Sequence, residues 1–188
     1  MKAIVLTYDK YHPIAEHMIE CYNKLWPDNP FIFRIPYQKY PYLLKEKYEE
    51  KIELIKTPSN IVLTMKKLLE DIEDDEWVYW CMDDRYPIGI NKPHLVNIYD
   101  WIKTITDNSI VSLNFTYKLN DWNVNINSDR KFRIRDSNGH KYYKIDNYKI
   151  IWFHQFMRAK ALKYLFDNIP DTIKNAKEMD YHKDELKL

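Results

Sequence analysis

The chain has 188 residues, of which 45% are hydrophobic and 30% are charged, the profile of one folded globular domain. Its formal net charge is +1, which excludes a broad basic field for nucleic acid and an acidic tail. Its two glycines, Gly89 and Gly139, exclude the glycine-rich phosphate loop and the GxGxxG dinucleotide fingerprint, because each of these motifs needs several glycines close together.

The cysteines and the apolar runs favour a cytoplasmic location. Cys21 and Cys81 each lie within an apolar run, so we expect buried free thiols, which are typical of a reducing compartment. The N-terminal apolar run is too short for a signal peptide. No stretch reaches the ~18 apolar residues that a membrane-spanning helix needs, and peripheral contact with a membrane stays open.

Apolar runs and helical periodicities alternate along residues 1–115. Short apolar runs predict strands at residues 3–8, 31–36, 52–56, 77–82 and 109–115. Helical spacing of apolar side chains predicts helices from His12 to Trp26, from Ser59 or Asn60 to Ile72, and over residues 93–106. This alternation predicts an α/β fold, a three-layer α/β/α sandwich with a mostly parallel, Rossmann-like central sheet.

The rest of the chain has a different pattern and is interpreted as an elaboration on the same sheet. Residues 116–130 are polar and are expected to form a loop. A hairpin is predicted over residues 131–135 and 141–146, with its turn at Asn138-Gly139, and a last helix over residues 156–168. The tail from Asp171 is polar and is expected to be loosely held. Residues 1–188 are therefore interpreted as a single domain.

Polar residues follow four of the predicted strands, at the carboxyl ends where open α/β sheets bind their ligands. Asp83 and Asp84 are the sharpest signal among them, because they follow a continuously apolar run that fits a strand buried on both faces. Adjacent carboxylates repel each other, and a divalent cation removes that conflict. Oxygen ligands select Mg²⁺ or Mn²⁺, which also bind a diphosphate. The alternative interpretation is a solvated turn.

Three stretches resemble one family of enzymes. The stretch WVYWCMDDRYP (77–87), preceded by SNIVLTMKKLLEDI (59–72), resembles metal-dependent glycosyltransferases of the GT-A fold and the bacterial surface-polysaccharide type. In these, an aspartate pair of the DxD type closes the fourth strand after such a helix. IVLTYDKYHPIAEHMIECY (4–22) looks like their first strand and helix, and IIWFHQFMRAKALKYLF (150–166) looks like a later element. The resemblance covers residues 1–170 and depends on the order and spacing of the elements.

The resemblance implies a glycosyltransferase that moves a sugar from a metal-bound nucleoside-diphosphate sugar, with UDP favoured by the family alone, to a hydroxyl of a glycan or related acceptor. It implies that residues 1–115 bind the donor, that residues 116–170 serve the acceptor, and that residues 171–188 form a polar tail. It implies Mn²⁺ or Mg²⁺ bound by Asp84 and Asp83, with His154 as a third candidate ligand. The implied donor-binding residues are Thr7, Tyr8, Asp9, Ser59, Asn60 and Asp83. The implied acceptor-side residues are His154 and Gln155.

Several alternatives stay open. An inverting enzyme needs a carboxylate to accept the proton of the acceptor hydroxyl, and the sequence does not choose among Asp121, Asp129 and Asp136. The chain is short for the family, so the acceptor side is expected to be shallow, completed by a homo-oligomer or degraded. A non-catalytic nucleotide- or glycan-binding module on the same fold is the main alternative. A nucleotidyltransferase is disfavoured because residues 7–13 contain no glycine.

Overall fold

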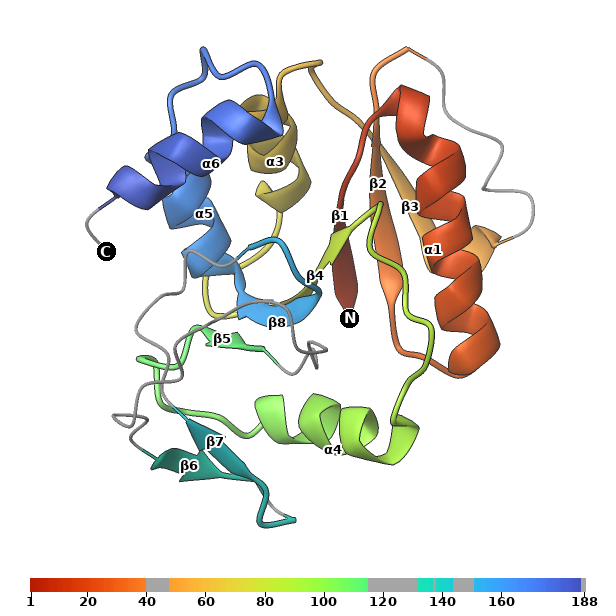
Figure 1. Ribbon diagram of the computed structural model, residues 1–188, viewed down its shortest axis with the longest axis vertical. Helices are drawn as coiled ribbons and strands as arrows, with labels where there is room; N and C mark the ends of the chain where they lie inside the picture. Colours follow the sequence, from red (N-terminus) through yellow and green to blue (C-terminus); the bar gives the residue numbers. More distant parts are fainter. Residues whose placement is uncertain (40–47, 115–131, 137, 144–150, 187–188) are drawn as a thin grey trace.

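The computed structural model describes residues 1–39, 48–114, 132–136, 138–143 and 151–186, and its centre is a six-stranded sheet with the order β3-β2-β1-β4-β8-β5 (Figure 1). The strands of this sheet are β1 (Lys2–Leu6), β2 (Ile32–Tyr37), β3 (Ile52–Lys56), β4 (Trp77–Met82), β5 (Ser112–Leu113) and β8 (Gln155–Arg158). A separate hairpin consists of β6 (Phe132–Arg135) and β7 (Lys141–Tyr143).

Five α-helices and two short 3₁₀ helices surround the sheet in the described part of the chain. The α-helices are α1 (His12–Leu25), α3 (Ile61–Leu69), α4 (Lys92–Ile102), α5 (Ala159–Asp167) and α6 (Ala176–Glu185). The 3₁₀ helices are η1 (Asp9–Tyr11) and η2 (Glu49–Lys51). Residues 40–47 and 115–131, the second of which includes the predicted polar loop, lie outside the described residues.

The sheet is mostly parallel, as the alternation of strands and helices predicts. Strands β3, β2, β1 and β4 are parallel neighbours, and β8 lies antiparallel between β4 and β5. All six residues of β4 are buried, which confirms the prediction of a strand covered on both faces. Tyr79 and Cys81 pack with α1 and α4, whereas Val78 and Trp80 pack with α3, α5 and α6. Figure 1 shows these two helical layers on either side of the sheet.

The last third of the chain differs from its prediction in two places. The helix predicted over residues 156–168 begins at Ala159, because Gln155–Arg158 form β8 and pair with β4. The guanidinium of Arg158 is buried and donates to the carbonyls of Ile105, Asp75 and Ile110 at 2.9, 3.0 and 3.1 Å, which fixes the end of this strand. The tail is not loosely held, because it forms α6 with Met179 fully buried against the sheet.

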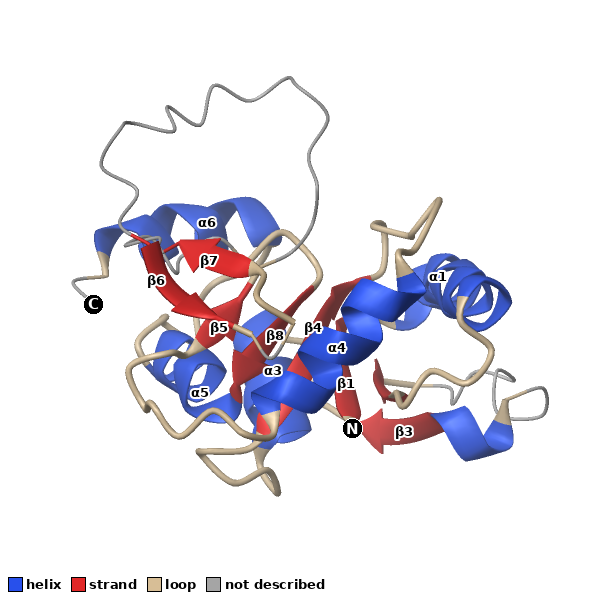
Figure 2. Cartoon of the chain, turned by 90° about the horizontal axis from the view of Figure 1, so that it is seen from below, coloured by secondary structure: helices blue, strands red, loops and turns tan. Residues whose placement is uncertain are grey.

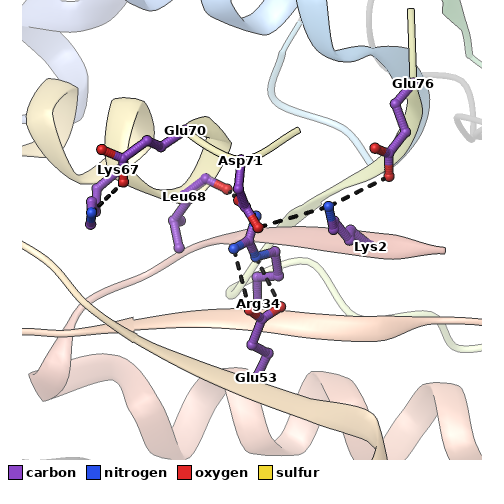
Figure 3. A network of polar contacts seen from close by, with 8 residues as sticks. All are labelled: Lys2, Arg34, Glu53, Lys67, Leu68, Glu70, Asp71 and Glu76. Atoms are coloured by element: carbon purple, nitrogen blue, oxygen red, sulfur yellow. Dashed lines mark hydrogen bonds and ion pairs between the residues drawn. The ribbon is translucent and has the colours of Figure 1, made fainter. Parts of the chain in front are cut away.

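The buried guanidinium of Arg34 links the sheet to the end of α3 (Figure 3). Arg34 in β2 is 3% exposed and donates to Asp71 Oδ1 at 2.6 Å, to the Leu68 carbonyl at 2.7 Å and to Glu53 Oε1 at 3.3 Å. Its Nε lies 3.0 Å from Glu53 Oε2, at an angle that does not make a hydrogen bond. A buried charge without a partner lowers the free energy of unfolding by roughly several kcal/mol. The carboxylates of Asp71 and Glu53 therefore make it possible to bury an arginine at this position.

Three smaller expectations concern the thiols, the hairpin and the membrane. Cys21 and Cys81 are both free, as predicted, with Cys81 buried and Cys21 half-buried. The hairpin turn is also confirmed: Gly139 has φ +81°, a conformation that favours glycine, and its N–H donates to the Asp136 carbonyl at 3.0 Å. Among the described residues, no helix is long and apolar enough to span a membrane.

Candidate donor-binding site

A cavity of about 800 Å³ opens at the carboxyl ends of β1 and β4. This is the edge where open α/β sheets place their ligands, and the volume suits a ligand of nucleotide-sugar size. The sheet contributes Thr7 and Tyr8 after β1 and Asp83, Asp84 and Arg85 after β4. The start of α3 contributes Ser59 and Thr64, and the start of α6 covers the opposite side. The structure therefore brings together strand ends that are far apart in the sequence.

Five of the sequence-predicted residues line this cavity, namely Thr7, Tyr8, Ser59, Asp83 and Asp84. Two others support it from outside. The Asp9 carboxylate accepts hydrogen bonds from the backbone N–H groups of Gln38 and Lys39 at 2.7 and 2.8 Å, which ties the end of β1 to the end of β2. Gln38 in turn lines the cavity. Asp9 thus positions Gln38, which lines the cavity.

Asn60, the other supporting residue, links α3 to the segment before α6. Its Oδ1 accepts from the Leu63 N–H at 3.0 Å, which caps α3 at its N-terminus. Its Nδ2 donates to the carbonyls of Asp171 and Ile173 at 2.6 and 3.0 Å. A single amide therefore holds the two helix starts that face each other across the cavity.

The carboxylate of Asp83 is in an unfavourable environment. The residue is 7% exposed, and within the described residues neither its Oδ2 nor the nearby buried Thr7 Oγ1 has a hydrogen-bond partner. Burial raises the pKa of Asp83 above its ordinary value, and the neighbouring Asp84 carboxylate raises it further. The Thr7 hydroxyl lies close enough to oppose this shift in part, without the alignment of a regular hydrogen bond. A cation at this carboxylate removes both penalties.

The cavity side of α6 carries basic residues that the sequence interpretation missed. Lys174, Asn175, Ala176 and Lys177 line the cavity at the start of this helix. The start is well defined, because Asn175 Oδ1 accepts from the Glu178 N–H at 3.0 Å and Asn175 Nδ2 donates back to Glu178 Oε1 at 2.9 Å. Asparagine followed by glutamate three residues later is a helix-start signature, and it was the signal available in the sequence. A helix N-terminus with two lysines favours an anionic ligand.

The start of α6 is held in place by an indole. Trp152 also lines the cavity, and its Nε1 donates to Asp180 Oδ1 at 2.6 Å. Burial alone would raise the pKa of Asp180, but the hydrogen bonds from Trp152 and Lys183 outweigh it and lower the pKa. Asp180 is therefore a partnered carboxylate with a lowered pKa, whereas Asp83 has an unpartnered oxygen and a raised pKa.

Two aromatic rings form part of the cavity wall nearest to the end of β1. Tyr8 and Tyr11 both line the cavity, and their ring centroids lie 4.5 Å apart. Both side chains are exposed, at 43% and 38%. Exposed aromatic rings beside a cavity are suited to stack on a planar group such as a nucleobase.

His154 and Gln155, which the resemblance places on the acceptor side, with His154 also as a third metal ligand, do not line the cavity. Both ring nitrogens of His154 are engaged, Nδ1 with the Tyr22 hydroxyl at 2.6 Å and Nε2 with the Met82 carbonyl at 2.9 Å. Burial lowers the pKa of His154 to about 4. Gln155 is buried in β8 and accepts from the Ser112 hydroxyl at 2.8 Å. Both are interior residues because β8 enters the middle of the sheet.

Of the three candidate bases, Asp136 lies within the described residues, and it does not line the cavity. Asp136 begins the turn between β6 and β7 and accepts hydrogen bonds from His140 and Asn97. Figures 1 and 2 both place this hairpin next to the edge strand β5. Asp121 and Asp129 lie outside the described residues.

The residues that line the cavity are suited to bind a divalent cation, and such a cation can also be bound by the phosphate groups of a ligand. Asp83 and Asp84 supply two hard carboxylate ligands, and the unpartnered Asp83 Oδ2 is what a cation would satisfy. Among the described residues, no third histidine, cysteine or carboxylate completes a three-ligand cluster with them. Mg²⁺ usually binds to one or two carboxylates and completes its coordination with water and substrate phosphates, which agrees with this arrangement.

Comparisons with solved structures establish the fold. The chain is similar to residues 1–349 of TarS from S. aureus, a GT-A-type glycosyltransferase, with 19% identity and a TM-score of 0.56 over 97% of this chain. It is also similar to the galactosyltransferase LgtC in complex with donor and acceptor sugar analogues, with 14% identity, a TM-score of 0.46, and coverage of 100% of this chain and 67% of the other.

A third similarity is to 2-C-methyl-D-erythritol 4-phosphate cytidylyltransferase (IspD) from Francisella tularensis, with 15% identity, a TM-score of 0.42, and coverage of 96% and 85%. TM-scores below 0.5, as for LgtC and IspD, do not establish a shared fold. No protein-family model and no curated protein matches the chain. The chain has the GT-A glycosyltransferase fold, and it spans 54% of the TarS chain.

Proposed function

We propose that this chain is a metal-dependent glycosyltransferase that binds a nucleoside-diphosphate sugar, with UDP as the favoured nucleotide, and transfers the sugar to a hydroxyl of a glycan or related acceptor. The observation that carries the proposal is the meeting of Asp83 and Asp84 with Lys174 and Lys177 in one cavity at the carboxyl edge of a GT-A sheet. Carboxylates beside lysines are suited to a ligand that brings both a cation and negative phosphates.

The donor is proposed to lie across the cavity with its diphosphate between β4 and α6. Asp84 is exposed and the neighbouring Asp83 is buried, and these two carboxylates would hold the metal. Lys174, Lys177 and the first turn of α6 neutralise the phosphates from the other side. The rings of Tyr8 and Tyr11 stack on the base, and Thr7 and Ser59 supply hydroxyls beside the nucleoside.

The chemistry follows from the charge that develops on the leaving group. As the bond between the sugar and the diphosphate breaks, negative charge grows on the phosphate oxygen, and preorganised cations stabilise it. A bound Mn²⁺ or Mg²⁺ supplies Lewis-acid stabilisation there. The lysines of α6 add to this effect because their helix is fixed by Asn60 and Trp152 and need not reorganise during the reaction.

The acceptor side is proposed to come from residues 116–170, with Asp121 or Asp129 as the base that accepts the hydroxyl proton. A cytoplasmic location is proposed from the two free thiols. The residues that would discriminate between a transferase and a non-catalytic binding module lie on this acceptor side. The two functions share the donor site and differ in turnover, so nucleotide binding and turnover must be measured separately.

The proposal is tested first by calorimetric titration of UDP, GDP and CDP, each with Mn²⁺ and with EDTA. We expect one of these nucleotides to bind in the presence of Mn²⁺, and we expect the Asp84→Ala variant to weaken that binding about 100-fold (~2.7 kcal/mol). Circular dichroism must show that the variant is folded. If folded wild-type protein binds none of the three nucleotides, the assignment of the cavity as a donor site is wrong.

The basic start of α6 provides a second prediction. Replacing Lys174 or Lys177 by glutamine is expected to weaken binding of the nucleoside diphosphate about 3- to 10-fold, because each lysine contributes a charge-assisted contact to phosphate. The free nucleoside should bind the variants and the wild type equally, since it carries no phosphate. Titrations of both ligands at low and high salt measure this difference.

The matched control for these variants is Lys163→Gln. Lys163 lies on α5 and pairs with Asp74 at 2.8 Å, and it does not line the donor cavity. Lys163→Gln removes one positive charge, as Lys174→Gln does, but leaves the proposed phosphate site unchanged. Equal losses in Lys163→Gln and Lys174→Gln would show that only the overall charge of the protein matters.

A further inference from the structure

Three metal-ligating side chains meet away from the donor cavity. His94 lies near the start of α4, Asp136 precedes the hairpin turn and His140 follows it. One ligand atom from each of these residues lies within 4.8 Å of the other two. The rings of His94 and His140 meet edge to face with centroids 4.5 Å apart, and neither lines the donor cavity. The cluster is a separate feature of the chain.

Asp136 is oriented by the groups around it. Its side chain has 0% exposure, and its Oδ1 accepts from the backbone N–H groups of Asn138 and His140, each at 2.9 Å. Its Oδ2 accepts from Asn97 Nδ2 at 2.7 Å and from the Tyr142 hydroxyl at 3.1 Å. Burial alone raises the pKa of Asp136, but hydrogen bonds, first from the His140 side chain and then from the His140 N–H, the Tyr142 hydroxyl and the Asn138 N–H, outweigh it and hold the pKa below its usual value. Partners of this kind fix the position of a metal-binding carboxylate.

The spacing of the donor atoms suits a small ion after a modest rearrangement. Tetrahedral bonds of ~2.0–2.2 Å place ligand atoms ~3.3 Å apart. His140 Nδ1 lies 2.8 Å from Asp136 Oδ2, and the largest separation in the cluster is under 4.8 Å. Both values approach ~3.3 Å with small side-chain rotations. An ion between His140 and Asp136 replaces their hydrogen bond, and the imidazole of His140 then carries its proton on Nε2 instead of Nδ1.

We propose that His94, Asp136 and His140 form a binding site for one Zn²⁺ ion per chain, which clamps the β6–β7 hairpin onto α4. Two imidazoles and one carboxylate favour Zn²⁺ over Mg²⁺ and Mn²⁺, which prefer oxygen ligands alone. Water takes the fourth position, on the side where His140 is exposed. The ion joins residues that are 42 to 46 positions apart, from 94 to 136 and from 94 to 140.

The clamp acts on an interface that is already formed in part. Asn138 Nδ2 donates to Asn97 Oδ1 at 2.5 Å, and the rings of Trp101 and Tyr142 stack with centroids 4.7 Å apart. These contacts bring the hairpin to α4 before any ion arrives, so the three ligands are preorganised. The ion then stabilises the docked hairpin, because it binds this arrangement and not the separated one.

The test uses the full chain without an affinity tag, titrated with ZnCl₂ alone by calorimetry. We expect one Zn²⁺ per chain, and we expect His94→Gln to weaken the affinity at least about 10-fold. His94→Gln is the informative variant because it leaves the hydrogen bond between Asp136 and His140 in place. Hydrogen exchange provides the second readout: Zn²⁺ should slow amide exchange in residues 132–143 of the wild type and not of His94→Gln.

The matched control is His17→Gln. The Nε2 of His17 lies 3.7 Å from the Sγ of Cys21, so this pair is another place where Zn²⁺ can bind. We expect His17→Gln to bind Zn²⁺ like the wild type. The proposal is overturned if folded wild type binds no Zn²⁺, if His94→Gln binds it equally well, or if His17→Gln alone removes binding. In those cases Asp136 and His140 are a hydrogen-bonded hairpin clasp, and the donor-site proposal is unaffected.

Discussion

The Asp83→Asn variant is expected to unfold at a higher denaturant concentration than the wild type and to lose most of its turnover. The Asp83 carboxylate is 7% exposed, its Oδ2 has no partner within the described residues, and both burial and Asp84 raise its pKa. An ionised carboxylate in this position destabilises the folded chain. A neutral amide of the same shape removes that penalty, so we expect a gain of about 1 kcal/mol in the free energy of unfolding without ligand.

The activity of the same variant should change in the opposite direction. An amide is a much weaker ligand for Mn²⁺ or Mg²⁺ than a carboxylate, and it carries no charge to balance the cation. We expect release of the nucleoside diphosphate from its sugar nucleotide to fall about 1,000-fold (~4 kcal/mol). Urea unfolding in EDTA measures the first effect. The rate of nucleotide release in Mn²⁺, with the sugar nucleotide that the calorimetry selects, measures the second.

Asp180→Asn is the matched control, because Asp180 lines the same cavity and undergoes the same chemical change. Its carboxylate is already satisfied by Trp152 Nε1 at 2.6 Å and Lys183 Nζ at 3.0 Å. This variant should therefore lose stability, by about 1 kcal/mol, where Asp83→Asn gains it. An Asp83→Asn protein that is less stable than the wild type and fully active would show that Asp83 has a structural role only.

A gain of stability together with a loss of activity in Asp83→Asn would show that Asp83 and Asp84 serve to bind a ligand and not to stabilise the fold. A chain gains no folding advantage from a desolvated carboxylate beside a second one. Such strain persists where a ligand relieves it. The cavity contains both kinds of carboxylate, the strained Asp83 and the satisfied Asp180, so the comparison can be made within a single site.

The sequence predicts which strand ends line the cavity, because strand ends can be read from local patterns. The apolar run of β4 places Asp83 and Asp84 at its end, and the run of β1 does the same for Thr7 and Tyr8. Parallel neighbours then bring these ends to one edge without further information. The residues on the far side of the cavity were missed for the opposite reason. The segment with Lys174 and Lys177 is mostly polar, and few apolar residues dock it, among them Ile173 and Met179.

The misplaced start of the last predicted helix has a tertiary cause. Residues 155–158 have no local feature that separates a strand from the first turn of the following helix. Their place is decided by pairing with β4, a strand about 80 positions away, in the register Trp77↔Arg158 to Trp80↔Gln155. Once β8 enters the sheet, His154 and Arg158 become buried at its two ends. Periodicity within one segment cannot supply this kind of information.

The buried His154 should make the protein sensitive to acid. Its Nε2 lies 2.9 Å from the Met82 carbonyl, which can only accept, so Nε2 carries the proton and Nδ1 accepts from the Tyr22 hydroxyl at 2.6 Å. Tyr22 in turn accepts from Tyr79, at 2.9 Å, and burial raises the pKa of both phenols. A second proton on His154 breaks this chain and buries a charge, which agrees with its lowered pKa of about 4.

The sign of the effect follows from the difference between folded and unfolded states. Between pH 6.5 and about 4 the unfolded chain binds a proton at His154 and the folded chain does not. The stability that neutral His154 contributes is therefore fully present above pH 6.5 and is lost as the pH falls. The total loss of free energy of unfolding is about 3 kcal/mol once the pH is below 4. Urea unfolding at half-unit steps of pH measures the curve, on which the carboxylates impose their own slope.

The variant His154→Gln separates the histidine from that background. A glutamine amide can donate to the Met82 carbonyl and accept from Tyr22, but it does not titrate. Subtracting the two stability curves should leave a step of about 3 kcal/mol between pH 6.5 and about 4, with the variant relatively more stable in acid. Parallel curves would mean that His154 takes up its proton as readily in the folded chain as in the unfolded one. Because the Met82 carbonyl directly precedes Asp83, a step of this size would also predict that nucleotide binding weakens over the same range of pH.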